Sequence, residues 1–148
     1  QKEIFMTIIA WDGKTLAADR RVCYNDEIFV TTKIFKNNLG IFGVAGEGVF
    51  CYEVLSWIKK NRVIKNWPKK LNKEDFAVIL FITNKKEILF YADCPLCDKL
   101  EVPFVAIGSG AQYARAAMFL GKTAKEAVEV ACMFDPYCGN GIDYLKVT

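Results

Sequence analysis

Side chains that could do acid–base or nucleophilic chemistry are restricted in this sequence, because it contains no histidine. This excludes serine–histidine and cysteine–histidine catalysis by these residues alone, and every zinc site with a histidine ligand. Acid–base chemistry must come from carboxylates, lysines, thiols, tyrosines or a chain terminus. The first candidates are Thr7, a hydroxyl at the start of an apolar run, and Asp19, a carboxylate at the end of the next run. Their chemistry depends on whether the fold brings them together.

The two apolar runs are joined by Asp12-Gly13. This dipeptide between runs rich in β-branched residues favours a tight type I′ turn, so the runs should pair antiparallel and bring Thr7 close to Asp19. A strict two-residue loop sets Met6 directly opposite Asp19, whereas a bulge in the hairpin would place Thr7 there. The sequence leaves both registers open.

The composition indicates one folded domain spanning residues 1–148. Hydrophobic residues make up 53% and aromatic residues 14% of the chain, enough to bury a substantial core. The net charge of +3 is too small a surplus to indicate a nucleic-acid partner. No apolar run approaches the ~20 residues that span a bilayer, and no signal-peptide pattern opens the chain. We therefore expect a cytoplasmic protein with no membrane partner.

Six cysteines are spread along the chain, most of them in apolar surroundings where a thiol packs as a small hydrophobic side chain. Cys94-Pro95-Leu96-Cys97 is a lone C-x-x-C motif in an expected loop. A redox or zinc role needs a strand-to-helix context or a second pair of ligands. Neither is visible, so we interpret the motif as two neighbouring loop thiols.

A basic segment, residues 59–70, contains six lysine or arginine residues around Trp67 and no acidic residue. Basic residues around an aromatic ring could bind a polyanion, but a solvated helix end followed by a loop is the commoner origin of such a run. A polyanion-binding module is therefore only the third hypothesis for the function.

Hydrophobic periodicity predicts strands in hairpins, with helices inserted between groups of strands. The expected strands are at residues 6–11, 14–19, 27–30, 33–35, 39–45, 77–83, 87–92, 102–107 and 142–147, and the expected helices are at 47–62, 111–120 and 123–135. The continuous apolar run 77–83 predicts a strand covered on both faces. Two antiparallel sheets packed face to face, with helices outside both, would cover it, and the element order favours α+β over alternating βαβ units.

The order of several short motifs resembles the proteasome β-subunits and the bacterial HslV-type peptidases. The motifs are Thr7-Ile-Ile-Ala, Leu16-Ala-Ala-Asp19, Thr32-Lys33-Ile34-Phe35, Val44-Ala45-Gly46, Ile107-Gly108-Ser109-Gly110-Ala-Gln-Tyr113-Ala and Asp135-Pro-Tyr-Cys138-Gly139. They cover nearly the whole chain in the order found in that family. The resemblance implies the N-terminal nucleophile (Ntn) hydrolase fold, a four-layer αββα sandwich, which agrees with the layers expected from the strand pattern.

The resemblance also implies a threonine peptidase, whose chemistry needs no histidine. Matched position by position, Thr7 is the nucleophile, and its free α-amine accepts the proton of the hydroxyl. Lys33 is the cation that lowers the proton affinity of the site, Asp19 holds Lys33, and the backbone N–H of Gly46 stabilises the oxyanion. No cofactor or metal is implied. The implied partners are identical subunits in a ring and a polypeptide substrate, with an ATP-dependent unfoldase as a further candidate.

Further residues match the surroundings of the nucleophile in that family. Ser109, Asp135 and Cys138 match an outer set that hydrogen-bonds around the terminus. Cys138 stands where serine is usual and is a weaker hydrogen-bonding group. An apolar set matches the pocket that holds the residue before the scissile bond: Val22, Phe35 and Val44. We therefore expect a hydrophobic side chain at that position of the substrate.

The residues before Thr7 support a different function. Gln1 to Met6 precede Thr7, and a threonine within a chain has no free α-amine. Active members of the resembled family expose the threonine by removing what comes before it. The alternative to an active peptidase is therefore a catalytically inactive or unprocessed proteasome-like subunit with a structural or interaction role.

Overall fold

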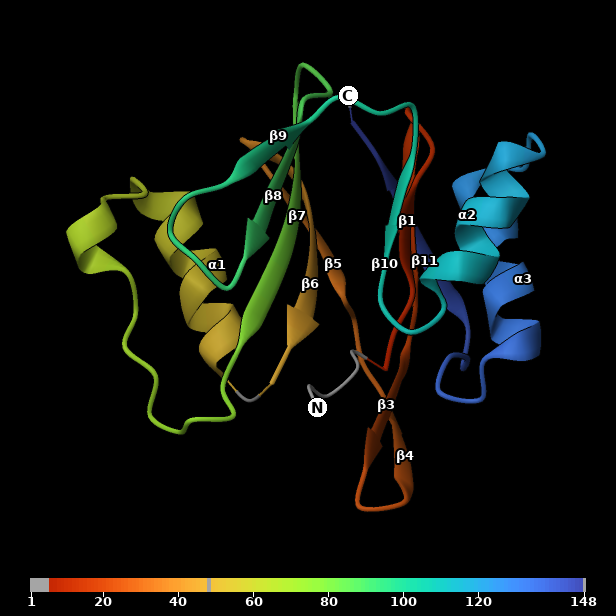
Figure 1. The fold of residues 1–148 in the computed structure, drawn as a ribbon, viewed down its shortest axis with the longest axis horizontal. Coiled ribbons are helices and arrows are strands. Elements are labelled where there is room, and N and C mark those ends of the chain that lie inside the picture. Colours follow the sequence, from red (N-terminus) through yellow and green to blue (C-terminus); the bar gives the residue numbers. More distant parts are fainter. Residues whose placement is uncertain (1–5, 48, 148) are drawn as a thin grey trace.

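Eleven strands and three α-helices form the part of the chain that the computed structural model describes, residues 6–47 and 49–147 (Figure 1). The strands are β1 (Ile9–Trp11), β2 (Thr15–Asp19), β3 (Arg21–Tyr24), β4 (Glu27–Val30), β5 (Ile34–Asn37), β6 (Gly40–Gly46), β7 (Ala77–Thr83), β8 (Ile88–Ala92), β9 (Asp98–Leu100), β10 (Val105–Ile107) and β11 (Ile142–Lys146). The helices are α1 (Phe50–Lys60), α2 (Ala111–Phe119) and α3 (Ala124–Phe134), with one short 3₁₀ helix, η1 (Ile64–Asn66). No helix in this part of the chain is long and apolar enough to cross a membrane.

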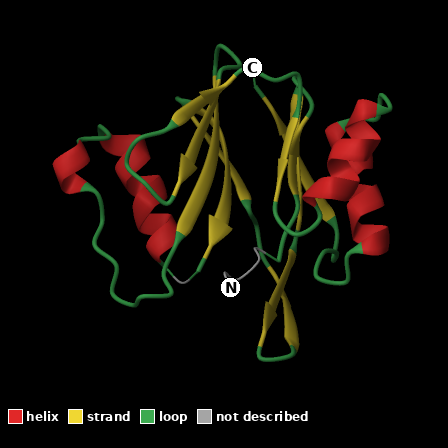
Figure 2. Cartoon of the chain, in the orientation of Figure 1, coloured by secondary structure: helices red, strands yellow, loops and turns green. Residues whose placement is uncertain are grey.

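These elements form four layers (Figure 2). One sheet has the strand order β10-β1-β2-β11 and the other has the order β5-β6-β7-β8-β9, with antiparallel pairing throughout. The sheets face each other, α1 covers the outer face of the five-stranded sheet, and α2 and α3 cover the outer face of the four-stranded sheet. The α+β class and the αββα sandwich predicted from the sequence are confirmed.

Strand β7 is covered on both faces, as its continuous apolar sequence predicts. Because side chains alternate along a strand, one set points into the core between the sheets and the other packs under α1. The set between the sheets is Val78, Leu80 and Ile82, and the set under α1 is Ala77, Ile79 and Phe81. Strand β1 is divided in the same way, with Ile9 between the sheets and Ala10 against α2 and α3.

The first hairpin, β1 with β2, has neither of the predicted registers. Trp11 faces Leu16, so the two residues between the paired ends of the hairpin are Gly13-Lys14 and not Asp12-Gly13. Gly13 has a φ of +94°, a conformation that favours glycine.

The carboxylate of Asp12 explains this difference. Its Oδ1 accepts hydrogen bonds from the N–H groups of Lys14 and Thr15, both at 2.8 Å, and its Oδ2 accepts from the N–H of Ala124 at 2.7 Å. Asp12 is therefore the residue before the two loop residues, and its carboxylate accepts N–H groups of the turn and of the first residue of α3.

At the open end of the hairpin this register sets Ile8 across from Asp19, with the Asp19 N–H donating to the Ile8 carbonyl over 3.2 Å. The two registers left open by the sequence placed Met6 or Thr7 directly across from Asp19, and both are wrong. Thr7 is next to Ile8 and its hydroxyl reaches Asp19 without a bulge.

The structure contains a two-stranded arm, β3 with β4, that the sequence predicts only in part. The periodicity indicates an extended piece at 27–30 but gives no strand at 21–24. Asn25 and Asp26 both have positive φ, +46° and +69°, as a two-residue type I′ loop requires. The arm projects away from both sheets (Figure 1) and its strands pair only with each other within the described residues.

The aromatic ring of the basic segment is partly buried against other rings. Trp67 lies edge-on to Trp57, with 5.0 Å between ring centroids, and edge-on to Phe50 at 6.1 Å. Lys70 pairs with Asp93 at 2.6 Å. Packing therefore accounts for Trp67, and the polyanion-binding hypothesis gains no open aromatic platform from it.

The C-x-x-C motif lies in the loop between β8 and β9, as predicted. Cys94 and Cys97 are both exposed free thiols. Within residues 6–47 and 49–147, no group of three or more histidine, cysteine, aspartate or glutamate side chains is arranged to hold a metal ion.

Candidate active site

Asp19, the last residue of β2, is the centre of the candidate site. Its carboxylate is fully buried and accepts five hydrogen bonds. The donors to Oδ1 are the Thr7 hydroxyl at 3.1 Å, the Ile8 N–H at 3.2 Å and the Lys33 ammonium at 2.7 Å. The donors to Oδ2 are the N–H groups of Arg21 at 3.2 Å and of Gly139 at 3.0 Å. A carboxylate bound from so many directions has a fixed orientation.

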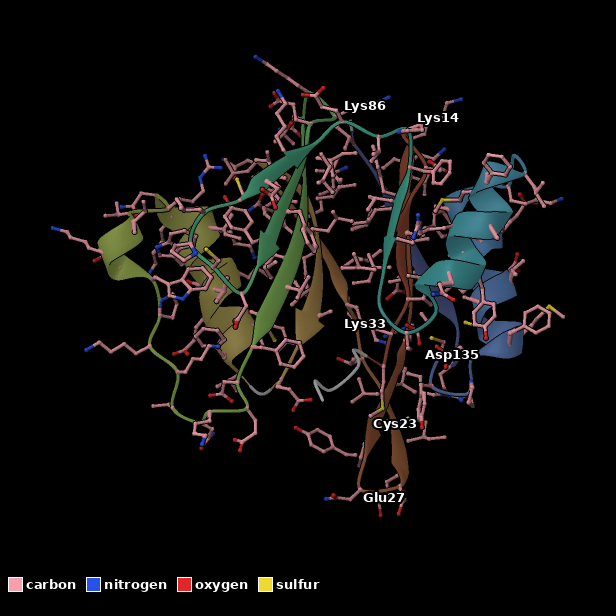
Figure 3. All side chains as sticks on the ribbon, viewed as in Figure 1. Lys14, Cys23, Glu27, Lys33, Lys86 and Asp135 are labelled. Atoms are coloured by element: carbon pink, nitrogen blue, oxygen red, sulfur yellow. The ribbon has the colours of Figure 1, made fainter. Side chains whose placement is uncertain are left out.

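Lys33 precedes β5 and lies between the two sheets (Figure 3). Its side chain is only 7% exposed, and its ammonium group forms a buried ion pair with Asp19. The backbone of Lys33 is held as well, because its carbonyl accepts the N–H of Val44 in β6 at 2.9 Å. The pair thus connects the four-stranded sheet to the five-stranded one, and each charge offsets the burial of the other.

Thr7 is 4% exposed, and its backbone is fixed as well as its hydroxyl. Its carbonyl oxygen accepts the N–H of Gly110 at 3.2 Å and the hydroxyl of Ser109 at 3.4 Å. Gly108 approaches so closely that a Cβ there would lie 2.2 Å from the Thr7 carbonyl oxygen. Thr7 is therefore held on one side by Asp19 and on the other by the segment that leads from β10 into α2.

A chain of polar contacts continues from Ser109 to the end of α3. The hydroxyl of Ser109 lies 3.9 Å from the sulfur of Cys138, and the Cys138 thiol donates to Asp135 Oδ2 at 3.3 Å. Burial raises the pKa of Cys138 well above its usual range, and the charges of Asp19 and Asp135 raise the pKa further. The Cys138 thiol therefore stays protonated at neutral pH and serves as a hydrogen-bond donor. Asp135 directly follows the last residue of α3 (Figure 3).

A pocket of about 160 Å³ opens beside Thr7 and Lys33. Its lining residues are Met6, Thr7, Val22, Cys23, Tyr24, Thr31, Thr32, Lys33, Val44, Ala45, Gly46, Glu47, Cys51, Tyr52 and Phe76. Of the three predicted pocket residues, Val22 and Val44 line it and Phe35 does not. Phe35 packs with the residues under α1, on the same face as Val44. Its ring lies edge-on to Tyr52, which does line the pocket, with 6.3 Å between the ring centroids.

Gly46, the last residue of β6, lines the same pocket. The N–H of Val44 points toward Lys33, and N–H groups of alternate residues in a strand point the same way. The Gly46 N–H is therefore directed to the edge of β6 where the pocket lies. A Cβ on Gly46 would lie 2.3 Å from the carbonyl oxygen of Phe76, so a glycine is required there by close packing.

Comparison with solved structures gives matches along almost the whole chain. The chain is similar to eukaryotic HslV from Trypanosoma brucei, with a TM-score of 0.70 and 19% identity over 94% of this chain and 97% of that chain. It is also similar to BPH of Thiobacillus denitrificans in complex with epoxomicin, with a TM-score of 0.63 and 16% identity over 96% of this chain and 99% of that chain. A further BPH structure matches with a TM-score of 0.60 and 16% identity, over 96% and 98%.

This is the proteasome/HslV-type Ntn-hydrolase fold. The resemblance read from the sequence motifs is confirmed at the level of the fold. No protein-family model and no curated protein matches the chain in sequence. Because a fold hosts many activities, the function has to be argued from the site.

Within this Ntn-hydrolase fold, two glycines belong to the site although the sequence assigns them no role. Gly108 permits the close approach to Thr7, and Gly139 donates its N–H to Asp19. Both have positive φ, +107° and +157°. Each lies inside one of the motifs that carry the resemblance, so a signal was present, but glycines are common in turns and the sequence does not show which backbone they approach.

Proposed function

We propose that this chain is a threonine-type peptidase subunit in which Thr7, once it is the N-terminal residue, hydrolyses peptide bonds. The observation that carries the proposal is the joint position of three side chains. The Thr7 hydroxyl and the Lys33 ammonium both contact Oδ1 of the buried Asp19 carboxylate, at the wall of a pocket. A strand threonine selected for β-propensity alone would need neither the ion pair nor the pocket.

In the proposed reaction, the Thr7 oxygen attacks the carbonyl carbon of the scissile peptide bond. The α-amine of Thr7 accepts the hydroxyl proton and later gives it to the leaving amine, and water then hydrolyses the acyl-threonine ester. The Gly46 N–H is directed toward the pocket, where it would donate to the oxyanion of the tetrahedral intermediate. Lys33 provides a positive charge that favours the neutral α-amine needed as a base.

The α-amine is the base that suits this site. An unperturbed α-amine has a pKa of about 7.7–8.0, close to the ideal for a general base at neutral pH. Asp19 also contacts the Thr7 hydroxyl, but its two oxygens already accept five donors, so it is placed to orient Thr7 and Lys33. The proposed mechanism therefore needs no histidine and no cofactor.

The position of Met6 supports an inactive role for the uncleaved chain. Met6 lines the same pocket as Thr7, so it occupies part of the wall against which a substrate would bind. With Met6 attached, the Thr7 nitrogen is an amide and has no basic lone pair. We propose that cleavage of the Met6–Thr7 bond converts an inactive form into the peptidase, and that the uncleaved form has a structural or interaction role.

We also propose that the chain associates with identical subunits, in a ring as the resemblance implies, and acts on polypeptides. Exposed large apolar side chains support association, because monomers rarely expose contiguous apolar patches. One group lies on the β3–β4 arm: Tyr24, Ile28, Phe29 and Val30. A second group lies on α2, α3 and the turn between them: Tyr113, Phe119, Leu120, Met133 and Phe134. An ATP-dependent unfoldase and a cytoplasmic location are proposed from the resemblance and the sequence alone.

The test compares three proteins: the full chain, a chain released by a specific protease so that it begins at Thr7, and the second protein with Thr7→Ala. We expect fluorogenic peptides with an apolar residue before the scissile bond to be cleaved by the Thr7-initiated protein and not by the other two. An epoxyketone should add covalently to Thr7, as detected by mass spectrometry. Absence of both cleavage and adduct in an oligomeric, folded Thr7-initiated protein would leave the inactive-subunit function as the better description.

A further inference from the structure

The guanidinium group of Arg21 joins both ends of the loop that follows α3. Its Nε donates to Oδ1 of Asn140 at 2.7 Å, and its Nη1 donates to the carbonyl oxygen of Pro136 at 2.7 Å. Arg21 is the first residue of β3, so these bonds connect the end of the first hairpin to a segment 115 and 119 residues away. The planar, forked guanidinium can serve both acceptors at once, which an ammonium group cannot do in the same geometry.

Between these two anchors, the Arg21 guanidinium lies against Gly139. A Cβ on Gly139 would lie 2.7 Å from Arg21 Nη2 and 2.9 Å from its Cζ. The Gly139 φ of +157° also disfavours other residues. Because Gly139 has no Cβ, the Arg21 guanidinium fits over its Cα. The same guanidinium is hydrogen-bonded to Pro136 before Gly139 and to Asn140 after it.

The Gly139 residue held in this way reaches the candidate active site directly. Its N–H donates to Asp19 Oδ2 at 3.0 Å, and its carbonyl oxygen accepts the N–H of Arg20 at 3.1 Å. The other carboxylate oxygen of Asp19 contacts Thr7 and Lys33. The Gly139 N–H thus restrains rotation of the carboxylate whose Oδ1 orients the proposed nucleophile and its cation.

We propose that Arg21 is a positioning residue for the Thr7 site: its guanidinium fastens the loop 136–140 so that the Gly139 N–H fixes the Asp19 carboxylate toward Thr7 and Lys33. The proposal rests on the proposed peptidase function for its effect on catalysis, but the fastening of the loop is independent of that function. The Arg21 side chain touches neither the substrate pocket nor the reacting atoms, so its effect should appear in kcat and leave substrate binding unchanged. The backbone N–H of Arg21 also donates to Asp19 Oδ2, and substitution of the side chain leaves this donor in place.

The experiment uses Arg21→Met and Arg21→Lys, with Arg115→Met on the exposed surface of α2 as the matched control. In the full chain, amide hydrogen exchange at Gly139 is measured. In the Thr7-initiated form, kcat and KM are measured with and without added ethylguanidinium. For Arg21→Met we expect faster Gly139 exchange, a fall in kcat of about 100-fold with KM unchanged, and partial recovery of kcat with ethylguanidinium. Arg21→Lys should recover only part of kcat, and Arg115→Met should match the unsubstituted protein.

Unchanged kcat in Arg21→Met, or a change confined to KM, would overturn the positioning role. Gly139 exchange that stays slow in Arg21→Met would overturn the fastening of the loop. If the unsubstituted Thr7-initiated protein cleaves no peptide, the proposed function fails while the exchange measurement still decides whether Arg21 holds Gly139. If Arg21→Met does not fold, the same measurements are made on Arg21→Lys. This variant keeps the positive charge and the aliphatic part of the side chain but cannot form both hydrogen bonds, to Pro136 and to Asn140, in the same geometry.

Discussion

Ile8 lies directly across the first hairpin from Asp19, each contributing a backbone hydrogen-bonding group to the other residue. The Asp19 N–H donates to the Ile8 carbonyl, and the Ile8 N–H donates to the Asp19 carboxylate. Because Thr7 precedes Ile8, the Thr7 hydroxyl comes within 3.1 Å of the same carboxylate. The register of this hairpin decides which N-terminal residue meets Asp19, and its loop is bound by Asp12.

Substituting Asp12 by alanine should lower the free energy of unfolding by about 1–2 kcal/mol, the usual cost of removing a side chain that accepts backbone N–H groups. Three N–H groups lose their acceptor, those of Lys14, Thr15 and Ala124. Urea denaturation measures the loss. Asp12→Asn is the control, because its single carbonyl oxygen can serve the turn but not α3 as well, and it should give an intermediate value. An unchanged free energy of unfolding in Asp12→Ala would contradict this account of the register.

Removing the buried cation of Lys33 should lower the free energy of unfolding by more than Asp12→Ala does. Lys33→Met leaves the Asp19 carboxylate buried without the ammonium that contacts it at 2.7 Å, so we expect a loss of about 3–5 kcal/mol. The double variant Lys33→Met, Asp19→Asn should be more stable than Lys33→Met, because no uncompensated charge remains. A double-mutant cycle in urea gives the coupling energy of the pair. Additive single effects would show that the ion pair does not couple these residues.

Peptide selectivity should depend on Val22, which lines the pocket from the β3–β4 arm. In the Thr7-initiated protein, Val22→Phe should lower kcat/KM by roughly 10-fold or more for peptides with leucine before the scissile bond, and much less for peptides with alanine there. The matched control is Ile28→Phe, which adds the same ring to an exposed position of β4 outside the pocket. Equal losses for both peptides would indicate that this pocket does not hold that side chain.

Stability should fall at alkaline pH. Burial raises the pKa of Cys51 to about 11 and that of Cys132 to about 11, so both thiols stay protonated in the folded chain after they ionise in the unfolded chain. The folded state then binds more protons, and stability decreases as the pH rises from about 9 to about 11. Urea midpoints between pH 8 and pH 11 measure the slope. The variant Cys51→Ala, Cys132→Ala should show a shallower slope, and an unaltered slope would contradict the assignment.

The sequence predicts most of the fold because its signals are local. The capping box of Thr123 and Glu126 marks the start of α3, and the continuous apolar run of β7 marks a strand with a layer on each side. The hairpin register is different in kind. Its decisive contact joins Asp12 to Ala124, 112 residues away, and no turn propensity contains that information.

The candidate site, too, combines features that the sequence predicts with features that only the fold reveals. The side chains of Thr7, Asp19 and Lys33 belong to motifs whose order suggests a common location, and the structure brings them into contact. Phe35 does not itself line the pocket but packs edge-on to Tyr52, which does, and the sequence does not show which of the two rings lies nearer to Thr7. Gly139 could not be placed at all, because its role is carried by a backbone N–H that every residue except proline possesses.

The strand order β10-β1-β2-β11 also has a consequence for biosynthesis. β2 pairs with β11, so among the described strands the first hairpin completes its sheet only with the strand that comes latest in the sequence. Because N-terminal segments leave the ribosome first, Thr7 and Asp19 are synthesised long before the Gly139 N–H that restrains the carboxylate. A nascent chain therefore carries the proposed nucleophile without its assembled surroundings. The hydrogen bonds around Asp19 are therefore completed only after residue 139 has been made.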